Sequence, residues 1–248
     1  MKERESMKII KVKDYQEMSR LASEQVIDKI NNTEKPVLGL ATGSTPEGLY
    51  QNLIDANKNN LVSFKNVTTF NLDEYIGLAS DDPNSYNYFM NEKLFKHIDI
   101  EPSNTHLPNG KATDIEQECQ DYEDLIKKTG KVNLQILGLG VNGHIAFNEP
   151  GTSFSSRTQK TQLVEETIEA NARFFDRKED VPTHAITMGI ESIMESEEII
   201  LLASGKNKAK AIKQLVEGEV TEDFPASILQ KHPHATIIVD QDAASLLE

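Results

Sequence analysis

Residues 132–151 read VNLQILGLGVNGHIAFNEPG. The first part, the apolar run 132–137, predicts a buried strand. The second part is rich in glycine and places His144 and Glu149 five residues apart, beside an apolar Ile-Ala-Phe. A loop that only reverses the chain has no need of these side chains. We therefore expect an active-site loop with an acid/base pair at the carboxyl end of a strand.

Strand and helix patterns alternate on both sides of this stretch, which predicts an α/β fold with a mostly parallel sheet. Two capping patterns, Asp14 with Glu17 and Thr113 with Glu116, each precede a helical periodicity. Residues 152–182 are polar and weakly periodic, and we expect them to cover the site. The predicted strands are 36–41, 66–72, 132–137, 185–188, 199–203 and 236–239, and the predicted helices are 14–30, 45–54, 85–95, 113–128 and 207–216.

The composition restricts the classes of partner. The 248 residues include 26 Lys and Arg against 40 Asp and Glu; the net charge of −14 opposes nucleic acid or an anionic membrane as partner. The single cysteine, Cys119, excludes an internal disulfide, suits a reducing cytosol and is expected to be inert. We find no membrane-spanning segment and no signal peptide. We expect one cytoplasmic domain over residues 1–248, with translation starting at Met1 or Met7.

A candidate anion site follows the first of these predicted strands. Thr42, Gly43, Ser44 and Thr45 lead into a helix that has proline in its first turn. Glycine permits close approach of the backbone, and a helix amino-terminus offers free N–H groups to an anion. The pattern is neither a Walker loop nor a dinucleotide fingerprint. Taken alone, it fits an ordinary helix cap better than a binding site.

Two adjacent carboxylates follow the next strand. Asp73 and Glu74 lie where residues 66–72 end, and successive side chains of a strand point to opposite sides. We therefore expect only one of them to face the cleft. A buried carboxylate can act as a base toward a carbon acid next to a carbonyl, although a surface turn explains this pair equally well.

His144 is the natural proton shuttle near neutral pH, and Glu149 is placed to orient it. The flanking glycines and the strand-end position favour chemistry over a structural role. We expect His232 and His234 to be ordinary turn and surface histidines, because no other ligand-type spacing lies near them. We expect no metal site.

With these loops assembled, the chain resembles the glucosamine-6-phosphate deaminases over residues 7–240. This resemblance implies a Rossmann-like open, mostly parallel sheet flanked by helices, with a mobile lid at about 152–182. It also implies conversion of D-glucosamine 6-phosphate and water to D-fructose 6-phosphate and ammonia, without metal or organic cofactor. The segments that carry it are LATGSTP (40–46), VSFK (62–65), FNLDEYIGL (70–78), GHIAFNEP (143–150), SRT (156–158) and ARFF (172–175).

The resemblance also implies roles for individual residues. Asp73 matches the base that moves a proton between C2 and C1 of the opened sugar. His144 matches the group that opens the pyranose ring, with Glu149 as its partner. Asn142 stands where many relatives carry Asp; an amide can orient the histidine ring but cannot stabilise an imidazolium as a carboxylate does. The residues expected to bind substrate, mostly at its phosphate, are Thr42, Gly43, Ser44, Thr45, Gly138, Arg173 and Lys208.

Two alternatives stay open. A 6-phosphogluconolactonase-type hydrolase typically has Arg after the Asp-Glu pair, where this chain has Tyr75, and Ser-Leu-Phe-Pro after the Gly-His, where it has Phe147 and its successors. A non-catalytic sugar-phosphate-binding regulator would need a DNA-binding module, and the charge opposes one. The sequence decides neither between monomer and homo-oligomer nor whether N-acetylglucosamine 6-phosphate activates the protein.

Overall fold

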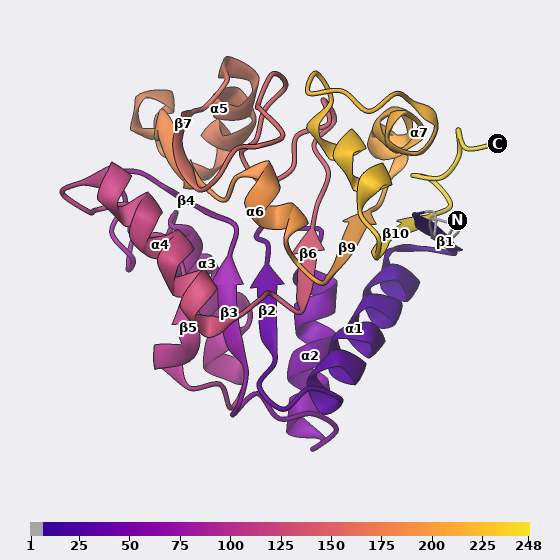
Figure 1. Ribbon diagram of the computed structural model, residues 1–248, viewed down its shortest axis with the longest axis horizontal. Helices are drawn as coiled ribbons and strands as arrows, with labels where there is room; N and C mark the ends of the chain where they lie inside the picture. Colours follow the sequence, from indigo (N-terminus) through magenta and orange to yellow (C-terminus); the bar gives the residue numbers. More distant parts are fainter. Residues whose placement is uncertain (1–6) are drawn as a thin grey trace.

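The main sheet has seven strands, all paired in parallel, in the order β1-β10-β9-β6-β2-β3-β5 (Figure 1). The computed structural model describes residues 7–248, so Met1, one of the two candidate starts, lies outside it. The sheet confirms the predicted α/β fold. Its strands are β1 (Lys8–Val12), β2 (Val37–Leu40), β3 (Thr68–Asn71), β5 (Thr105–His106), β6 (Leu134–Leu137), β9 (Glu198–Ala203) and β10 (Ala235–Asp240).

Helices cover both faces of this sheet. They are α1 (Tyr15–Asn31), α2 (Glu47–Lys58), α3 (Tyr86–Lys93), α4 (Ile115–Thr129), α5 (Glu165–Asn171), α6 (Ile190–Met194) and α7 (Ala209–Glu217). Within residues 7–248, none of them is long and apolar enough to cross a membrane. Short 3-10 turns complete the set: η1 (Phe95–His97), η2 (Pro102–Asn104), η3 (Ala172–Phe174), η4 (Lys178–Asp180), η5 (Lys206–Lys208) and η6 (Pro225–Lys231).

The predicted strand 185–188 exists but was wrongly assigned to the parallel sheet. It is β8 (His184–Thr187), the centre of a second, antiparallel sheet between β4 (Asp73–Tyr75) and β7 (Gln159–Gln162). A single residue, Leu72, separates β3 from β4; its N–H donates to Leu40 and its carbonyl accepts from Met188. The sequence does not show this change of sheet, because no glycine or proline separates the two strands in residues 68–75.

The amino-terminal caps test the capping patterns directly. Asp14 accepts a hydrogen bond from the N–H of Glu17 at 2.9 Å, as predicted. The cap of α4 is Asp114 and not Thr113, because the Asp114 carboxylate accepts from the N–H of Gln117 at 3.0 Å. Thr113 and Asp114 are adjacent there, and the carboxylate of Asp114 takes the capping position instead of the hydroxyl of Thr113.

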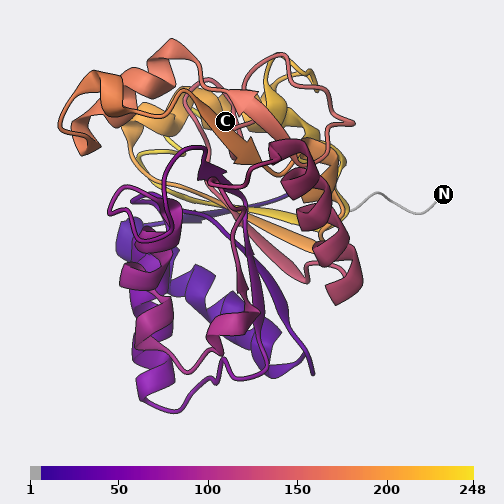
Figure 2. The ribbon, with the colours of Figure 1, turned by 90° about the vertical axis from the view of Figure 1, so that its left-hand side faces the viewer.

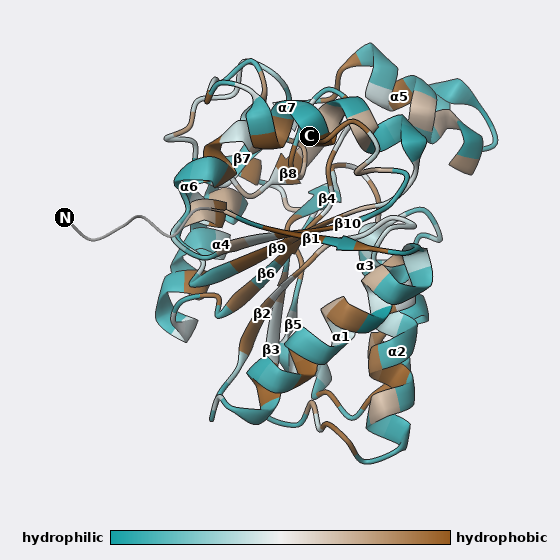
Figure 3. Cartoon of the chain, turned by 90° about the vertical axis from the view of Figure 1, so that its right-hand side faces the viewer, coloured by the Kyte–Doolittle hydropathy of each residue, from teal (hydrophilic) through white to brown (hydrophobic). Residues whose placement is uncertain are grey.

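Alternate residues of the strands enter separate hydrophobic clusters on the two faces of the sheet. In β9, Ile199 and Leu201 pack against α6 and α7, whereas Ile200 and Leu202 pack against α1 and α2. Burial on both faces explains the continuous apolar runs of these strands. Figure 3 shows them brown between helices whose outer faces are mostly teal.

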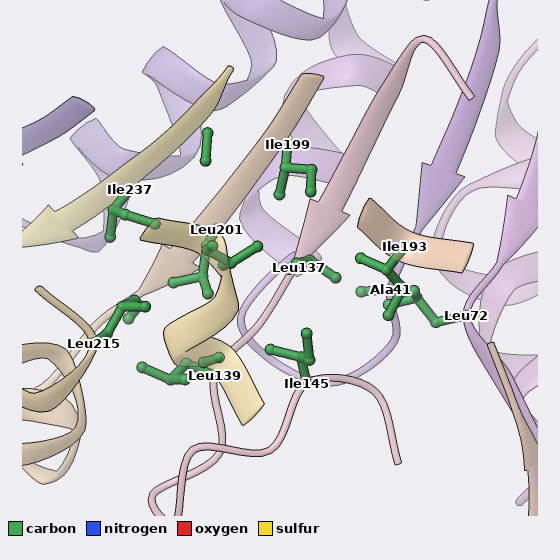
Figure 4. Packing of buried hydrophobic residues seen from close by; sticks show 14 of the residues in the cluster. Ala41, Leu72, Leu137, Leu139, Ile145, Ile193, Ile199, Leu201, Leu215 and Ile237 are labelled. Atoms are coloured by element: carbon green, nitrogen blue, oxygen red, sulfur yellow. The ribbon is translucent and has the colours of Figure 1, made fainter. Parts of the chain in front are cut away.

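The first of these clusters extends beyond the strands into the loops that follow them. Leu72, Leu139 and Ile145 are buried there beside Leu137, as Figure 4 shows. Each of these loops is therefore fixed by an apolar anchor. The segment that carries β7 and α5 lies at the end of the molecule toward which β2, β3 and β6 point (Figures 1 and 2).

Candidate active site

Four strands, β9, β6, β2 and β3, are neighbours in the main sheet, and their carboxyl ends lie side by side. Leu40 lies opposite Asn71, and Leu137 lies opposite Leu201. The next strand of the sheet after β2, which is β3, pairs on one side of β2, and the later strand β6 pairs on its other side. The direction in which strands are added to the sheet therefore reverses between β2 and β6. Open α/β sheets bind ligands at such a point. The loops after these four strands carry most of the predicted site residues.

Glu74 holds the start of α3. Its carboxylate accepts hydrogen bonds from the backbone N–H groups of Tyr75, Tyr86 and Asn87, each at 2.9 Å. The side chain is buried, with 2 % exposed. A carboxylate at a helix amino-terminus satisfies otherwise unpaired N–H groups. Glu74 is thus the structural member of the adjacent carboxylate pair.

Asp73 has the opposite environment. It is also buried, but within residues 7–248 no protein group donates a hydrogen bond to its carboxylate. Burial, and then the neighbouring charge of Glu74, raise the pKa of Asp73 to about 8. A carboxylate with a pKa near neutrality accepts protons far more readily than an exposed one. Of the two side chains, Asp73 is the one fit for proton transfer.

His144 lies at the end of a chain of hydrogen bonds. Its Nδ1 is 2.7 Å from Oδ1 of Asn142, and Nδ2 of Asn142 donates to Oε2 of Glu149 at 3.0 Å. The second carboxylate oxygen, Oε1, accepts from the hydroxyl of Thr167 in α5 at 2.9 Å. Because the amide oxygen can only accept, His144 carries its proton on Nδ1 and keeps the lone pair of Nε2 for other groups.

The amide of Asn142 does not separate His144 from a carboxylate. Oε2 of Glu149 is also 3.6 Å from Nδ1 of His144. Burial lowers the pKa of His144, the charge of Glu149 opposes that shift, and the charge of Lys208 adds to it. The net direction is downward, so the imidazole is neutral at pH 7 and can accept a proton.

Glycines allow this loop to close around the histidine. A Cβ on Gly140 would lie 2.2 Å from the ring of His144, and one on Gly143 would lie 2.3 Å from the ring of Phe224. Gly143 also has a φ of 88°, which disfavours other residues. The glycine pattern therefore positions His144 directly.

The loop 41–46 has the form expected of an anion cradle. Gly43 adopts a φ of 97°, and no side chain caps the amino end of α2. Two tyrosines fix the loop from outside the motif. The hydroxyl of Tyr15 donates to the carbonyls of Ser44 and Thr45, and the hydroxyl of Tyr50 is hydrogen-bonded to the backbone of Ala41.

The remaining predicted residues fall into two groups. Thr42 and Gly138 are half-buried; Thr42 lies two residues after the end of β2, and Gly138 directly follows β6. Lys208, after β9, donates to the carbonyl of Leu139 at 2.6 Å. Arg173, in η3, is exposed and stacks over the ring of Phe174 at 4.6 Å. In the described part of the chain, no hydrogen bond or ion pair joins it to the loop 42–45. The structure thus places Lys208 at the site and Arg173 on the covering segment.

His232 corrects the expectation of a surface residue. It is buried, with 3 % exposed, and its Nε2 is 2.8 Å from the carbonyl of Ser196. Cys119 is buried, and burial raises the pKa of its thiol to about 11. Across residues 7–248, no group of three or more His, Cys, Asp or Glu side chains could hold a metal ion.

The sequence gives no indication that three further residues contribute to the site. Tyr15 and Tyr50 lie within the predicted helices 14–30 and 45–54 and belong to no motif, yet they fix the loop 41–46. Thr167 lies in a polar segment without motif, yet it contacts Glu149. The periodicity that places a tyrosine on a buried helix face gives no sign of what its hydroxyl reaches.

Comparison with known proteins agrees with this geometry. The family model of glucosamine-6-phosphate isomerases and 6-phosphogluconolactonases matches residues 13–238. Glucosamine-6-phosphate deaminase of Oceanobacillus iheyensis is 58 % identical over 237 residues, which are 96 % of this chain and 95 % of that protein. Glucosamine-6-phosphate deaminase 1 of Bacillus subtilis is 51 % identical over 240 residues, 97 % of this chain and 99 % of its own.

The solved structures give the same assignment. A structure described as a monomeric glucosamine-6-phosphate deaminase superposes with a TM-score of 0.95 at 51 % identity, covering 97 % of this chain and 100 % of that one. The 6-phosphogluconolactonase of Trypanosoma cruzi has a TM-score of 0.76 at 19 % identity, covering 97 % of each chain, and this likeness shows the fold alone. The chain belongs to the family of glucosamine-6-phosphate isomerases and 6-phosphogluconolactonases, and within it to the glucosamine-6-phosphate deaminases.

Proposed function

We propose that the protein converts D-glucosamine 6-phosphate and water to D-fructose 6-phosphate and ammonia. The observation that carries this proposal is that two proton-transfer groups follow the carboxyl ends of strands in the same sheet. Asp73 is a buried carboxylate to which no group of residues 7–248 donates a hydrogen bond, and its pKa is raised to about 8. His144 has a lowered pKa, and its Nε2 has no hydrogen-bond partner in the described part of the chain. Aldose–ketose isomerisation of a cyclic sugar needs both a ring-opening group and a base at carbon.

The two groups divide the reaction. His144 takes the proton of the anomeric hydroxyl through Nε2 and returns one to the ring oxygen, which opens the sugar. Asp73 then removes the proton from C2 and delivers it to C1, while the C1 oxygen takes a proton from the ammonium group of the substrate. C2 thereby becomes the carbon of an iminium; addition of water there and loss of ammonia give the ketose. Glu149 stabilises the imidazolium that forms in the first step, and Asn142 orients the ring.

The phosphate is held by the loop after β2 and by cations. Thr42, Gly43, Ser44 and Thr45 precede the uncapped amino end of α2, which favours an anion. Lys208 adds positive charge close to His144, as its effect on the pKa of that residue indicates. A Cβ added to Gly138 would meet no atom of the described residues within 4 Å, so the space beside this glycine is open.

Residues 152–182 act as a lid in this proposal. Arg173 is exposed on this segment, and inward movement of the lid brings it to the phosphate. A net charge of −14 makes such local cations necessary for binding a sugar phosphate. We further propose that residues 1–248 form one cytoplasmic domain that acts as a monomer, as the structure at 51 % identity is described, and that it needs no metal or organic cofactor.

The decisive assay incubates purified protein with D-glucosamine 6-phosphate and follows ammonia and fructose 6-phosphate together. We expect equal amounts of the two products. Ammonia no higher than in a protein-free control would contradict the proposal. Hydrolysis of 6-phosphogluconolactone in its place would establish the hydrolase alternative, which the shared fold and the common family model support.

A further inference from the structure

One face of helix α5 contacts both halves of the site. Thr167 and Asn171 are four residues apart and so lie on the same side of the helix. The Thr167 hydroxyl donates to Oε1 of Glu149 at 2.9 Å. Nδ2 of Asn171 donates to the hydroxyl of Tyr75 at 2.8 Å. Glu149 belongs to the loop of His144, and Tyr75 lies two residues after Asp73.

The contact from Thr167 determines how Glu149 faces the histidine. With Oε1 engaged by the hydroxyl, Oε2 points to Nδ2 of Asn142 at 3.0 Å and lies 3.6 Å from Nδ1 of His144. A hydrogen bond to a carboxylate is among the stronger ones in proteins. Without it, the carboxylate can rotate and the distance from Oε2 to the imidazole is no longer fixed.

We propose that Thr167 is a positioning residue for the reaction, since it holds Glu149 against Asn142 and His144. The proposal rests on the proposed function for its effect on turnover. It joins the lid to the acid/base chain Thr167–Glu149–Asn142–His144. Placing α5 over the site completes this chain, and withdrawing α5 releases Glu149. The position of the lid therefore sets the proton affinity of His144.

Two charged groups act on His144: Glu149 from its own loop and Lys208 from the segment after β9. They have opposite effects, because the carboxylate favours the imidazolium and the ammonium disfavours it. Loss of the Thr167 hydroxyl loosens Glu149 and leaves Lys208 in place. The pKa of His144 should therefore fall.

The activity test compares three variants. Thr167→Val keeps the shape of the side chain and removes the hydroxyl, and Thr167→Ser keeps the hydroxyl. Thr161→Val removes a hydroxyl from β7 that, among the described residues, is hydrogen-bonded only to the carbonyl of the adjacent Gln162. We expect Thr167→Val to lower kcat roughly tenfold, as loss of one hydrogen bond to a charged group would, with KM nearly unchanged. Thr167→Ser and Thr161→Val should resemble the parent. A Thr167→Val enzyme with normal kcat, or a Thr167→Ser enzyme as impaired as Thr167→Val, would contradict the proposal.

A second test needs no turnover. The imidazole of His144 is titrated by NMR in the parent and in Thr167→Val, and again with Glu149→Gln in both backgrounds. We expect Thr167→Val to lower the midpoint when Glu149 is present and to have no effect when Gln replaces it. Equal midpoints in the parent and Thr167→Val would overturn the positioning role even in an active enzyme. A protein without deaminase activity that shows the expected shift would refute the proposed function and leave the contact established.

Discussion

Burial shifts the pKa of the two proton-transfer groups in opposite directions, and the groups differ in their contacts. Asp73 is buried with no hydrogen-bond donor among residues 7–248 and lies next to the charge of Glu74, and its pKa is raised to about 8. Burial lowers the pKa of His144, which is held by Asn142 and Glu149 and receives opposing effects from the charges of Glu149 and Lys208. Burial is thus the largest cause in both halves, and hydrogen-bond partners act on the second group as well.

This difference shows why adjacent carboxylates can have different roles. Asp73 and Glu74 are both buried, but within residues 7–248 Glu74 accepts hydrogen bonds from three backbone N–H groups and Asp73 accepts none. Hydrogen bonds stabilise the charged form of Glu74 and fix a helix. Their absence leaves Asp73 with a strong tendency to take up a proton, which is what a base toward a carbon acid requires.

The largest expected effect is that of Asp73→Asn. The amide keeps the shape of the side chain but cannot accept the C2 proton, so kcat should fall by about 10³-fold or more. Substrate binding, measured by calorimetry with D-glucosamine 6-phosphate, should remain. Turnover within tenfold of the parent would show that another residue is the base.

The stability of the same variant gives a control on its fold. The pKa of Asp73 is higher in the folded protein than in the unfolded chain, so its contribution to stability is present at acid pH and is lost as the pH rises through about 8. Asn does not ionise. Asp73→Asn should therefore melt at a higher temperature than the parent at pH 9, and a lower melting temperature there would contradict this account of Asp73.

Replacing His144 tests the other half. His144→Gln removes the free Nε2, and kcat/KM should fall roughly 100-fold. The loss is smaller than for Asp73, because sugars in solution open without a catalyst, if slowly. His234→Gln is the matched control and should retain activity, because His234 lies next to the amino end of β10, at the end of the sheet opposite the site. Equal losses in both variants would indicate unfolding and not chemistry.

Glu74→Gln should affect stability more than catalysis. It weakens three hydrogen bonds from buried N–H groups, which should cost about 1–3 kcal/mol in free energy of unfolding. It also removes the charge that helps to raise the pKa of Asp73. The acid limb of the kcat/KM profile should therefore move to lower pH, and a move to higher pH would be inconsistent with the like-charge effect.

The smallest effect is expected from Asn142→Asp. A carboxylate at 2.7 Å from Nδ1 should stabilise the imidazolium and raise the pKa of His144 above that of the parent. The neutral form needed for ring opening should then appear at higher pH, with kcat at pH 8 changed only a few-fold. An unaltered His144 titration would show that Asn142 does not contact the ring as described.

The sequence predicted those parts of the fold and site that depend on local pattern. The apolar runs located the strands of the main sheet except the two edge strands: β1 interrupts its apolar residues with Lys8 and Lys11, and β5 has only two residues. The glycine loops located Gly43 and His144. The change of sheet at Leu72, the division between Asp73 and Glu74, and the reach of Thr167 depend on residues distant in the chain. Neither periodicity nor motif spacing carries that information.

The most direct test of the central claim is a titration of the Asp73 carboxyl carbon by NMR, with Asp73→Asn used to assign the signal. The account predicts a midpoint near pH 8, because burial and the charge of Glu74 both disfavour the carboxylate. A midpoint close to the ordinary aspartate value of about 4 would contradict it.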